Sequence, residues 1–169
     1  MLNHKLSRKA QLFLLGALLG VAIFLLVYGT APLNVANDAF CRGGYIEKDI
    51  QQHYAGWLFY KRSAIGWPLG VTDAVNYPGG VSVAYTDSIP LLAVLCRPLT
   101  ALGGTFQYFG WFTLVCFALQ GGFGALLCSL FAGGLFAPLA GSLVFASSPV
   151  LIERAFRHTS LGAQWLVLA

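Results

Sequence analysis

The sequence predicts an all-α polytopic transmembrane helical protein with a structured external loop bearing a juxtamembrane amphipathic helix. The first observation is composition: 57% of residues are hydrophobic and 9% are charged, whereas a soluble domain has roughly 45–50% and about 25%. The second is that no charged side chain occurs from Pro98 to Ile152. The third is that five of the six acidic residues lie between Thr30 and Ser88, namely Asp38, Glu47, Asp49, Asp73 and Asp87.

The first predicted span covers residues 10–29. An uncharged run from Ala10 to Tyr28 follows the basic residues Lys5, Arg8 and Lys9, and a spanning helix needs about 20 residues. A cleavable signal peptide is the alternative, but its apolar region has about 7–15 residues. We therefore expect an uncleaved span with a cytoplasmic N-terminus, as basic flanks indicate.

Residues 30–85 form the predicted external loop. Within it, the segment 45–61 carries apolar side chains at spacings of four, four, three and one, at Ile46, Ile50, Tyr54, Trp57 and Leu58. This spacing predicts a helix with one apolar face. Aromatic rings suit the headgroup region, so we expect this helix to lie flat on the membrane, with its neighbouring aromatic residues at the interface (Trp57, Phe59, Tyr60 and Trp67).

Further spans are predicted at 83–102, 106–129 and 135–152, and a truncated fifth span starts at residue 161. Small residues in the third span, from Gly121 to Ala125, favour close helix packing in lipid. Alternating passes place the cluster Arg154, Arg157 and His158 on the cytoplasmic side. If the count of crossings is off by one, this cluster faces the side of the loop instead.

Charge and motifs exclude several classes of function. The net charge of +4 is small and its cations are scattered, whereas a nucleic-acid binder clusters them on one face. The four cysteines show no CxxC spacing, which predicts neither a disulfide framework nor a metal site. No P-loop or Rossmann motif occurs either, so the sequence predicts no cofactor-binding motif and no metal ligands.

Two carboxylates are candidate catalytic groups. Asp49 and His53 are four residues apart on the predicted helix and share a face, which would suit a general base; a solvated surface aspartate is the alternative. Asp87 stands at the start of the predicted second span, where an ionisable group is usually functional. It could equally cap that helix, since Pro90 fits the first turn. Both interpretations of Asp87 stay open.

Basic residues supply candidate phosphate ligands, because guanidinium groups match phosphate oxygens. In the external loop these are Arg42, Lys61 and Arg62, for which contact with lipid headgroups is the alternative. Arg154, Arg157 and His158 form a second set, for which topology signalling is the alternative.

The order of these features resembles the GT-C superfamily of polytopic membrane glycosyltransferases, and specifically the N-terminal part of an uncharacterised bacterial branch. The resemblance rests on five stretches: Asp49-Ile-Gln-Gln-His53-Tyr54-Ala-Gly-Trp57, Trp67-Pro68-Leu69-Gly70, Tyr85-Thr86-Asp87-Ser88-Ile89-Pro90, Gln107-Tyr108-Phe109-Gly110 and Arg157-His158-Thr159-Ser160-Leu161.

By this resemblance, Asp49 would deprotonate the acceptor hydroxyl, and basic residues would hold the phosphate of a polyprenyl-phosphate sugar donor. Transfer to a glycan or lipid acceptor would occur on the external face of the bacterial inner (plasma) membrane. Some members need Mg²⁺ or Mn²⁺ and others do not, and this chain lacks an adjacent Asp-x-Asp pair. A membrane transporter and a non-catalytic subunit of envelope polysaccharide biosynthesis are the alternatives.

Overall fold

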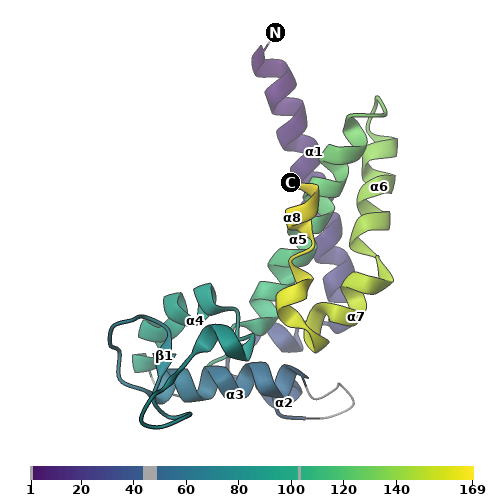
Figure 1. Cartoon of the computed structure of the whole chain (residues 1–169). Helices are drawn as coiled ribbons and strands as arrows, with labels where there is room; N and C mark the ends of the chain where they lie inside the picture. Colours follow the sequence, from purple (N-terminus) through teal and green to yellow (C-terminus); the bar gives the residue numbers. More distant parts are fainter. Residues whose placement is uncertain (1, 44–48, 103) are drawn as a thin grey trace. The chain divides into compact units, whose positions relative to one another are not determined.

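The computed structural model describes residues 2–43, 49–102 and 104–169, and its elements are mostly helices (Figure 1). The chain divides into two compact units. The helical unit comprises residues 1–31, 111–155 and 161–169, and the loop unit comprises residues 32–110 and 156–160. The polar loop expected from the sequence is thus a folded body with a core of its own.

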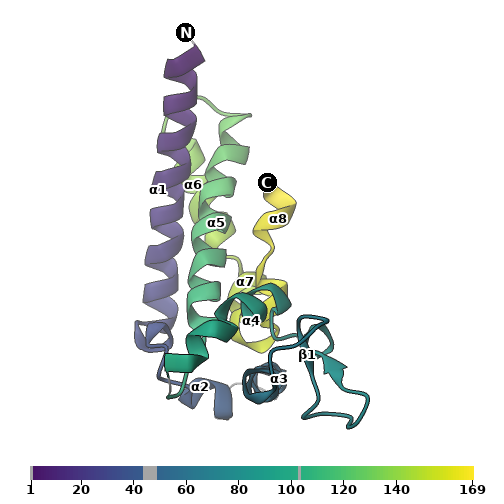
Figure 2. The ribbon, with the colours of Figure 1, turned by 90° about the vertical axis from the view of Figure 1, so that its left-hand side faces the viewer.

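The helical unit is built from α1 (Leu2–Tyr28), α5 (Phe109–Ser129) and α6 (Phe136–Ala146), with the start of α7 (Pro149–Arg157) and α8 (Trp165–Leu168). Figure 2 shows α1 and α5 running side by side. Two stretches are long and apolar enough to cross a membrane, Arg8–Tyr28 and Phe109–Ser129, each of 21 residues. At 1.5 Å per residue each reaches about 30 Å, the thickness of the hydrocarbon core. The helices expected at 10–29 and 106–129 are confirmed.

Glycines allow α1 and α5 to touch backbone to backbone. A Cβ atom added to Gly16 would clash with the carbonyl oxygen of Gly121, and one added to Gly20 would clash with the carbonyl oxygen of Phe117. Small residues allow this approach in lipid, where there is no hydrophobic drive between helices. The packing role predicted for the glycines of α5 is borne out, with Gly16 and Gly20 as partners.

The span expected at 135–152 is not one helix. It consists of α6 and α7, which are bent by 42° at a short break. Pro149 lacks an amide hydrogen and disfavours helical geometry in the residue before it, which accounts for the break at residues 147 and 148. The described chain therefore has two helices able to cross a membrane, or three if α6 and α7 together form a broken span.

The prediction of a membrane span at residues 83–102 is wrong. These residues form a 3₁₀ turn (Val83–Thr86), the seven-residue helix α4 (Pro90–Cys96) and a second 3₁₀ stretch (Arg97–Leu102). The apolar helical part, Pro90–Ala101, is shorter than a candidate span. The physical reason lies at Asp87 and Ile89, which both have φ of 53°. Left-handed backbone at two non-glycine residues cannot continue a right-handed helix.

Losing that crossing changes the predicted side of α7. At one end of the helical unit, Arg8 of α1 donates a hydrogen bond to the carbonyl of Gly134 at 3.0 Å. At the other end, Tyr28 donates to the carbonyl of Ile152 in α7 at 2.6 Å. The start of α7 thus lies at the end of this unit opposite the basic N-terminus. Within this unit, Arg154 therefore lies toward the end opposite the basic N-terminus, whereas alternating passes had placed it on the same side. The membrane side of Arg157 and His158 stays a prediction.

The loop unit contains a short 3₁₀ turn, two helices and a small hairpin before α4. Its elements are η1 (Ala31–Leu33), α2 (Ala39–Arg42), α3 (Asp49–Arg62), β1 (Val71–Thr72) and β2 (Val81–Ser82). The strands are antiparallel, with Val71 opposite Ser82. Residues 45–48, the start of the helix expected from the sequence, lie outside the described residues.

Buried Gln107 joins the two ends of the loop unit. Its amide nitrogen donates to the carbonyls of Pro32 at 2.8 Å and Asn34 at 3.1 Å, and its amide oxygen accepts from the backbone of Gly110 at 3.1 Å. Buried polar groups are costly unless they are hydrogen-bonded, and here the amide is satisfied from both ends. The points where the chain enters and leaves the unit are therefore held together.

The aromatic face of α3 faces protein. Trp57 is fully buried and Tyr60 nearly so. The Trp57 indole donates to the carbonyl of Phe106 at 2.8 Å and packs edge-on against Tyr108, with ring centroids 5.0 Å apart. The expectation that α3 lies on the membrane with Trp57 and Tyr60 as anchors is wrong, because this face forms the core of the loop unit.

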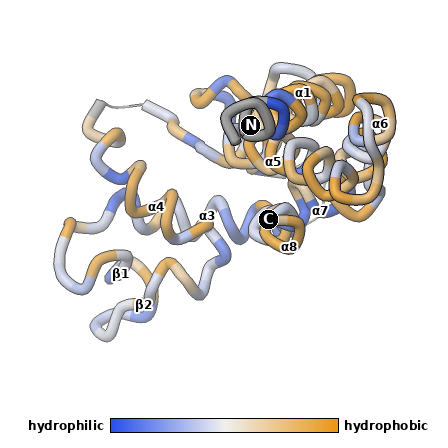
Figure 3. Tube along the Cα trace, turned by 90° about the horizontal axis from the view of Figure 1, so that it is seen from above, coloured by the Kyte–Doolittle hydropathy of each residue, from blue (hydrophilic) through white to orange (hydrophobic). Residues whose placement is uncertain are grey.

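A different surface of the loop unit is apolar and exposed. Leu91, Leu95 and Leu99 are four residues apart and all exposed, forming one stripe along α4 and the 3₁₀ stretch. Residues 65–69, which precede β1, carry three further exposed apolar side chains, those of Ile65, Trp67 and Leu69. In Figure 3 the trace of α4 is largely coloured as hydrophobic. We call these six residues the apolar patch.

Candidate catalytic pair and basic pocket

The exposed carboxylate of Asp49 is paired with an imidazole from the far end of the chain. Asp49 is the first residue of α3, and its Oδ2 lies 3.1 Å from Nε2 of His158. The two side chains are 41% and 50% exposed, respectively. The pairing of Asp49 with His53 expected from helical spacing is not the contact that forms. The Asp49 carboxylate also stays partly exposed to solvent, so a substrate could reach it.

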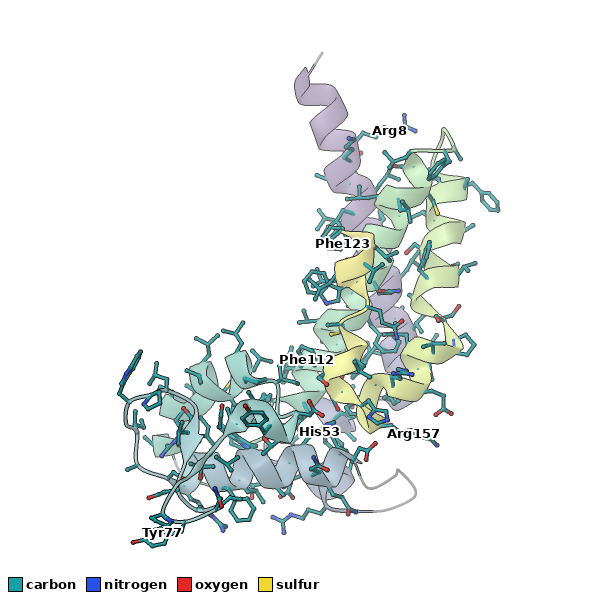
Figure 4. All side chains as sticks on the ribbon, in the orientation of Figure 1. Arg8, His53, Tyr77, Phe112, Phe123 and Arg157 are labelled. Carbon is teal, nitrogen blue, oxygen red and sulfur yellow. The ribbon has the colours of Figure 1, made fainter. Side chains whose placement is uncertain are left out.

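His53 instead faces the second candidate carboxylate. Its Nε2 lies 4.0 Å from Oδ2 of Asp87; the imidazole is 3% exposed and the carboxylate 62%. Figure 4 labels His53, which projects from α3, and Arg157 at the end of α7. The carboxylates and imidazoles singled out in the sequence therefore form two pairs, Asp49 with His158 and His53 with Asp87.

Gly56 positions Asp87 beside His53. A Cβ atom on Gly56 would overlap the side chains of Thr86 and Ser88, so only glycine lets this segment approach α3 so closely. The hydroxyl of Ser88 donates to the carbonyl of His53 at 2.5 Å, and Tyr108 donates to the carbonyl of Ser88. The tight turn at residues 86–88 is thus held against α3 from two sides.

Asp87 does not cap α4. The residue at the N-cap position is Ile89, and no side chain accepts a hydrogen bond there. Asp87 instead ends the preceding 3₁₀ turn with left-handed backbone, which aspartate tolerates better than most residues. The capping interpretation is wrong, and the carboxylate is free to face His53.

Burial lowers the pKa of His53. The nearby carboxylates of Asp87 and Asp49 oppose this shift, and His158 adds to it. Nδ1 of His53 is buried without a hydrogen-bond partner among the described residues. Desolvation disfavours the charged imidazole, so the structure keeps His53 neutral to lower pH than a free histidine.

A cavity on the loop unit brings together the three basic residues predicted from its sequence. Its volume of about 460 Å³ lies within the usual range of roughly 300–1,000 Å³ for ligand pockets. It is lined by α2, α3 and residues 104–105. Its charged lining residues are Arg42, Lys61 and Arg62. We call this cavity the basic pocket.

One acidic residue organises the rim of the basic pocket. Asp38 accepts from Arg42 at 2.5 Å and from the Tyr54 hydroxyl at 2.6 Å. Burial raises the pKa of Asp38, but these two hydrogen bonds outweigh it and lower the pKa overall. The sequence reasoning missed Asp38 and Tyr54 as partners of Arg42. The spacing of four between Asp38 and Arg42 was the available signal.

The basic pocket and the Asp49 pair lie on opposite sides of α3. Each helical residue advances about 100° around the axis. Asp49 and His53 lie on one face, whereas the α3 residues that line the pocket are Gln51, Tyr54, Ala55, Leu58, Lys61 and Arg62. The mean directions of these two sets differ by about 160°. Arg42, Lys61 and Arg62 therefore do not form one site with Asp49.

The second set of predicted phosphate ligands divides between the two units. Arg157 belongs to the loop unit and directly precedes His158, the partner of Asp49. Arg154 belongs to the helical unit. Arg157 is thus the residue of this second set that belongs to the loop unit and adjoins His158 in the sequence.

No metal site is assembled by the described residues. Among them, no group of three or more His, Cys, Asp or Glu side chains could hold a metal ion. The two carboxylate–imidazole pairs supply two groups each, fewer than the three or four protein ligands of a typical zinc site.

Residues from four of the five stretches that carry the resemblance meet in the loop unit. Tyr108 bonds the turn at residues 86–88, this turn bonds α3, and His158 reaches Asp49. A family model described as a domain of unknown function (DUF6311) matches residues 17–169. The chain belongs to the DUF6311 family. No protein of curated function and no solved structure shows a significant match to this DUF6311 chain.

Proposed function

We propose that this DUF6311 chain is part of a GT-C-like membrane glycosyltransferase, which moves a sugar from a polyprenyl-phosphate carrier to a hydroxyl acceptor. The observation that carries the proposal is the contact of the exposed Asp49 carboxylate with His158 at 3.1 Å. A carboxylate that is open to substrate on one side and oriented on the other suits a general base.

In the proposed reaction, Asp49 accepts the proton of the acceptor hydroxyl while the oxygen attacks the anomeric carbon. The bond between that carbon and the carrier phosphate oxygen breaks, and polyprenyl phosphate leaves with the electron pair. One attack from the face opposite the leaving group inverts the anomeric centre. His158 is a positioning residue, which holds the Asp49 carboxylate toward the acceptor.

Arg157 is the proposed ligand of the carrier phosphate. It lies in the loop unit next to His158, whereas the basic pocket opens on the far side of α3. A guanidinium group can bind two phosphate oxygens at once and stabilise the charge that develops on the leaving group. Its position next to His158 in the chain favours Arg157 over Arg42, Lys61 and Arg62 for this role.

We further propose that the loop unit rests on the membrane surface with its apolar patch in the lipid. The chain enters this unit from α1 and leaves it into α5, and both helices contain candidate spans. The only charged side chain on α4 and the following 3₁₀ stretch, that of Arg97, turns inward and donates to the carbonyl of Ser63. Amphipathic surfaces of this kind bind the boundary between headgroups and acyl chains.

The substitution Asp49→Asn in the full-length protein tests the proposed reaction. Transfer from a polyprenyl-phosphate sugar should fall by about 10²–10⁴-fold, the usual contribution of a general base. Asp73→Asn is the matched control, because Asp73 is an exposed aspartate of the same unit outside both pairs. Undiminished transfer by a normally inserted Asp49→Asn protein would exclude this role and leave a non-catalytic subunit as the better interpretation.

A further inference from the structure

The basic pocket combines three cations with little opposing charge. Arg42 is paired with Asp38 at 2.5 Å. Within the described part of the chain, Lys61 and Arg62 have no ion-pair partner. Cations that share a cavity repel one another, and a bound anion offsets this repulsion. The arrangement therefore favours an anionic ligand.

The state of Lys61 agrees with this geometry. Burial is the largest cause of a lowered pKa for Lys61, and the positive charge of Arg62 lowers it further. Asp38 and Arg42 have smaller effects, which raise and lower the pKa, respectively. A bound anion would relieve this repulsion. The remaining lining offers neutral hydrogen-bonding groups, including the side chains of Gln51 and Thr105.

We propose that the basic pocket binds a phosphate or diphosphate group, at a site separate from the Asp49 pair. Lys61 supplies a point charge, and Arg62 offers a planar fork of donors that matches phosphate oxygens. Arg42 stays fixed by Asp38 and Tyr54 and presents its remaining donors from the rim. Because the pocket opens about 160° around α3 from Asp49, its ligand is not the phosphate of the reacting sugar donor.

Two sources carry this chemistry: a soluble phosphate compound and the headgroup of an anionic lipid. Reaction of the Lys61 amine with an acetylating reagent, followed by peptide mass spectrometry, reports on the pocket in both cases. The full-length protein is labelled in detergent with and without inorganic diphosphate. It is also labelled in nanodiscs of phosphatidylcholine alone or mixed with phosphatidylglycerol. Potassium sulfate at matched ionic strength corrects for screening.

Binding of diphosphate or of a lipid headgroup in the basic pocket should slow the acetylation of Lys61. The acetylation of Lys9 in α1 should be unchanged. At ten times the dissociation constant, the rate should fall about tenfold, because only the empty pocket reacts. Arg62→Gln should abolish the protection, and Lys9→Gln, which removes one cation elsewhere, should retain it. Thermal unfolding in detergent, with Lys9→Gln for comparison, reports whether the Arg62→Gln protein is folded.

Protection by diphosphate in detergent would assign a soluble ligand. Protection only in nanodiscs with phosphatidylglycerol would assign a lipid headgroup. Equal acetylation of Lys61 under all conditions, or protection that survives Arg62→Gln, would overturn the proposal. None of these outcomes depends on sugar transfer. The test of the phosphate site is therefore independent of the test of the proposed glycosyltransferase.

Discussion

The Nε2 atom of His158 lies 3.1 Å from the carboxylate of Asp49, although the two residues are 109 positions apart in the chain (158 − 49). Asp49 begins α3, and His158 follows α7. The contact joins the residues that the sequence marked as a candidate base and as a basic cluster. It converts two separate expectations into one pair that can be tested by mutation.

The first prediction concerns coupling within this pair. If His158 acts by holding Asp49, His158→Gln should lower kcat by about tenfold or more with little change in KM, since general-base geometry is lost while binding persists. The double variant should be no slower than Asp49→Asn alone, because residues that act as a unit are not additive. Steady-state rates of the three variants measure this, and additive losses would contradict the pairing.

Gly56 is predicted to be intolerant of a methyl group. Gly56→Ala pushes a Cβ into the side chains of Thr86 and Ser88, and overpacking of this kind costs about 1–3 kcal/mol. Gly66→Ala is the matched control, since nothing lies within 4 Å of its added Cβ. Thermal unfolding of the two proteins in detergent should show a lower Tm for Gly56→Ala alone. Equal values would contradict the close approach.

Gln107 is predicted to be a stability determinant of the loop unit. Gln107→Leu removes both donors to Pro32 and Asn34 and the acceptor for Gly110. Leaving buried backbone groups unsatisfied costs about 1–3 kcal/mol each. Limited proteolysis should cut the loop unit faster in this variant than in Gln52→Leu, which alters an exposed glutamine of α3. The same rate of cleavage in both would contradict the role of Gln107.

His53 is predicted to make stability depend on pH. Its pKa is lower in the folded protein than in the unfolded chain, chiefly because of burial. The unfolded chain therefore binds the proton more readily, and stability is lost as pH falls below about 6.5. In His53→Gln this part of the pH dependence should be absent. Denaturation midpoints measured between pH 8 and 5 check this, and unchanged curves would contradict it.

The apolar patch is predicted to face lipid. Spin labels on single cysteines at Leu91, Leu95 and Leu99, placed in a protein without its four native cysteines, should collide more with oxygen than with a water-soluble nickel chelate. Oxygen partitions into the acyl region, whereas the chelate stays in water. A label at Tyr77, which is 84% exposed, should show the reverse as the control. Preferential nickel collisions along the stripe would contradict membrane contact.

Local patterns predicted the parts of this protein that depend on neighbouring residues in the chain. The uncharged runs indicated α1 and α5, because length and apolarity alone decide whether a helix can cross a bilayer. The spacing of Ile50, Tyr54 and Trp57 predicted α3 and its apolar face. The glycines of α5 predicted close packing, because only a residue without a side chain allows backbones to touch.

Tertiary structure decided the surroundings of α3, the end of the expected second span and the partner of Asp49. These features depend on contacts between segments that are distant in the sequence. The sequence could not show that the apolar face of α3 would be covered by Phe106 and Tyr108, since lipid and protein cover such a face equally well. Left-handed backbone at Asp87 and Ile89 ended the expected second span, which local apolarity alone had predicted. The fold of the loop unit brought His158 to Asp49, whereas helical spacing alone had paired Asp49 with His53.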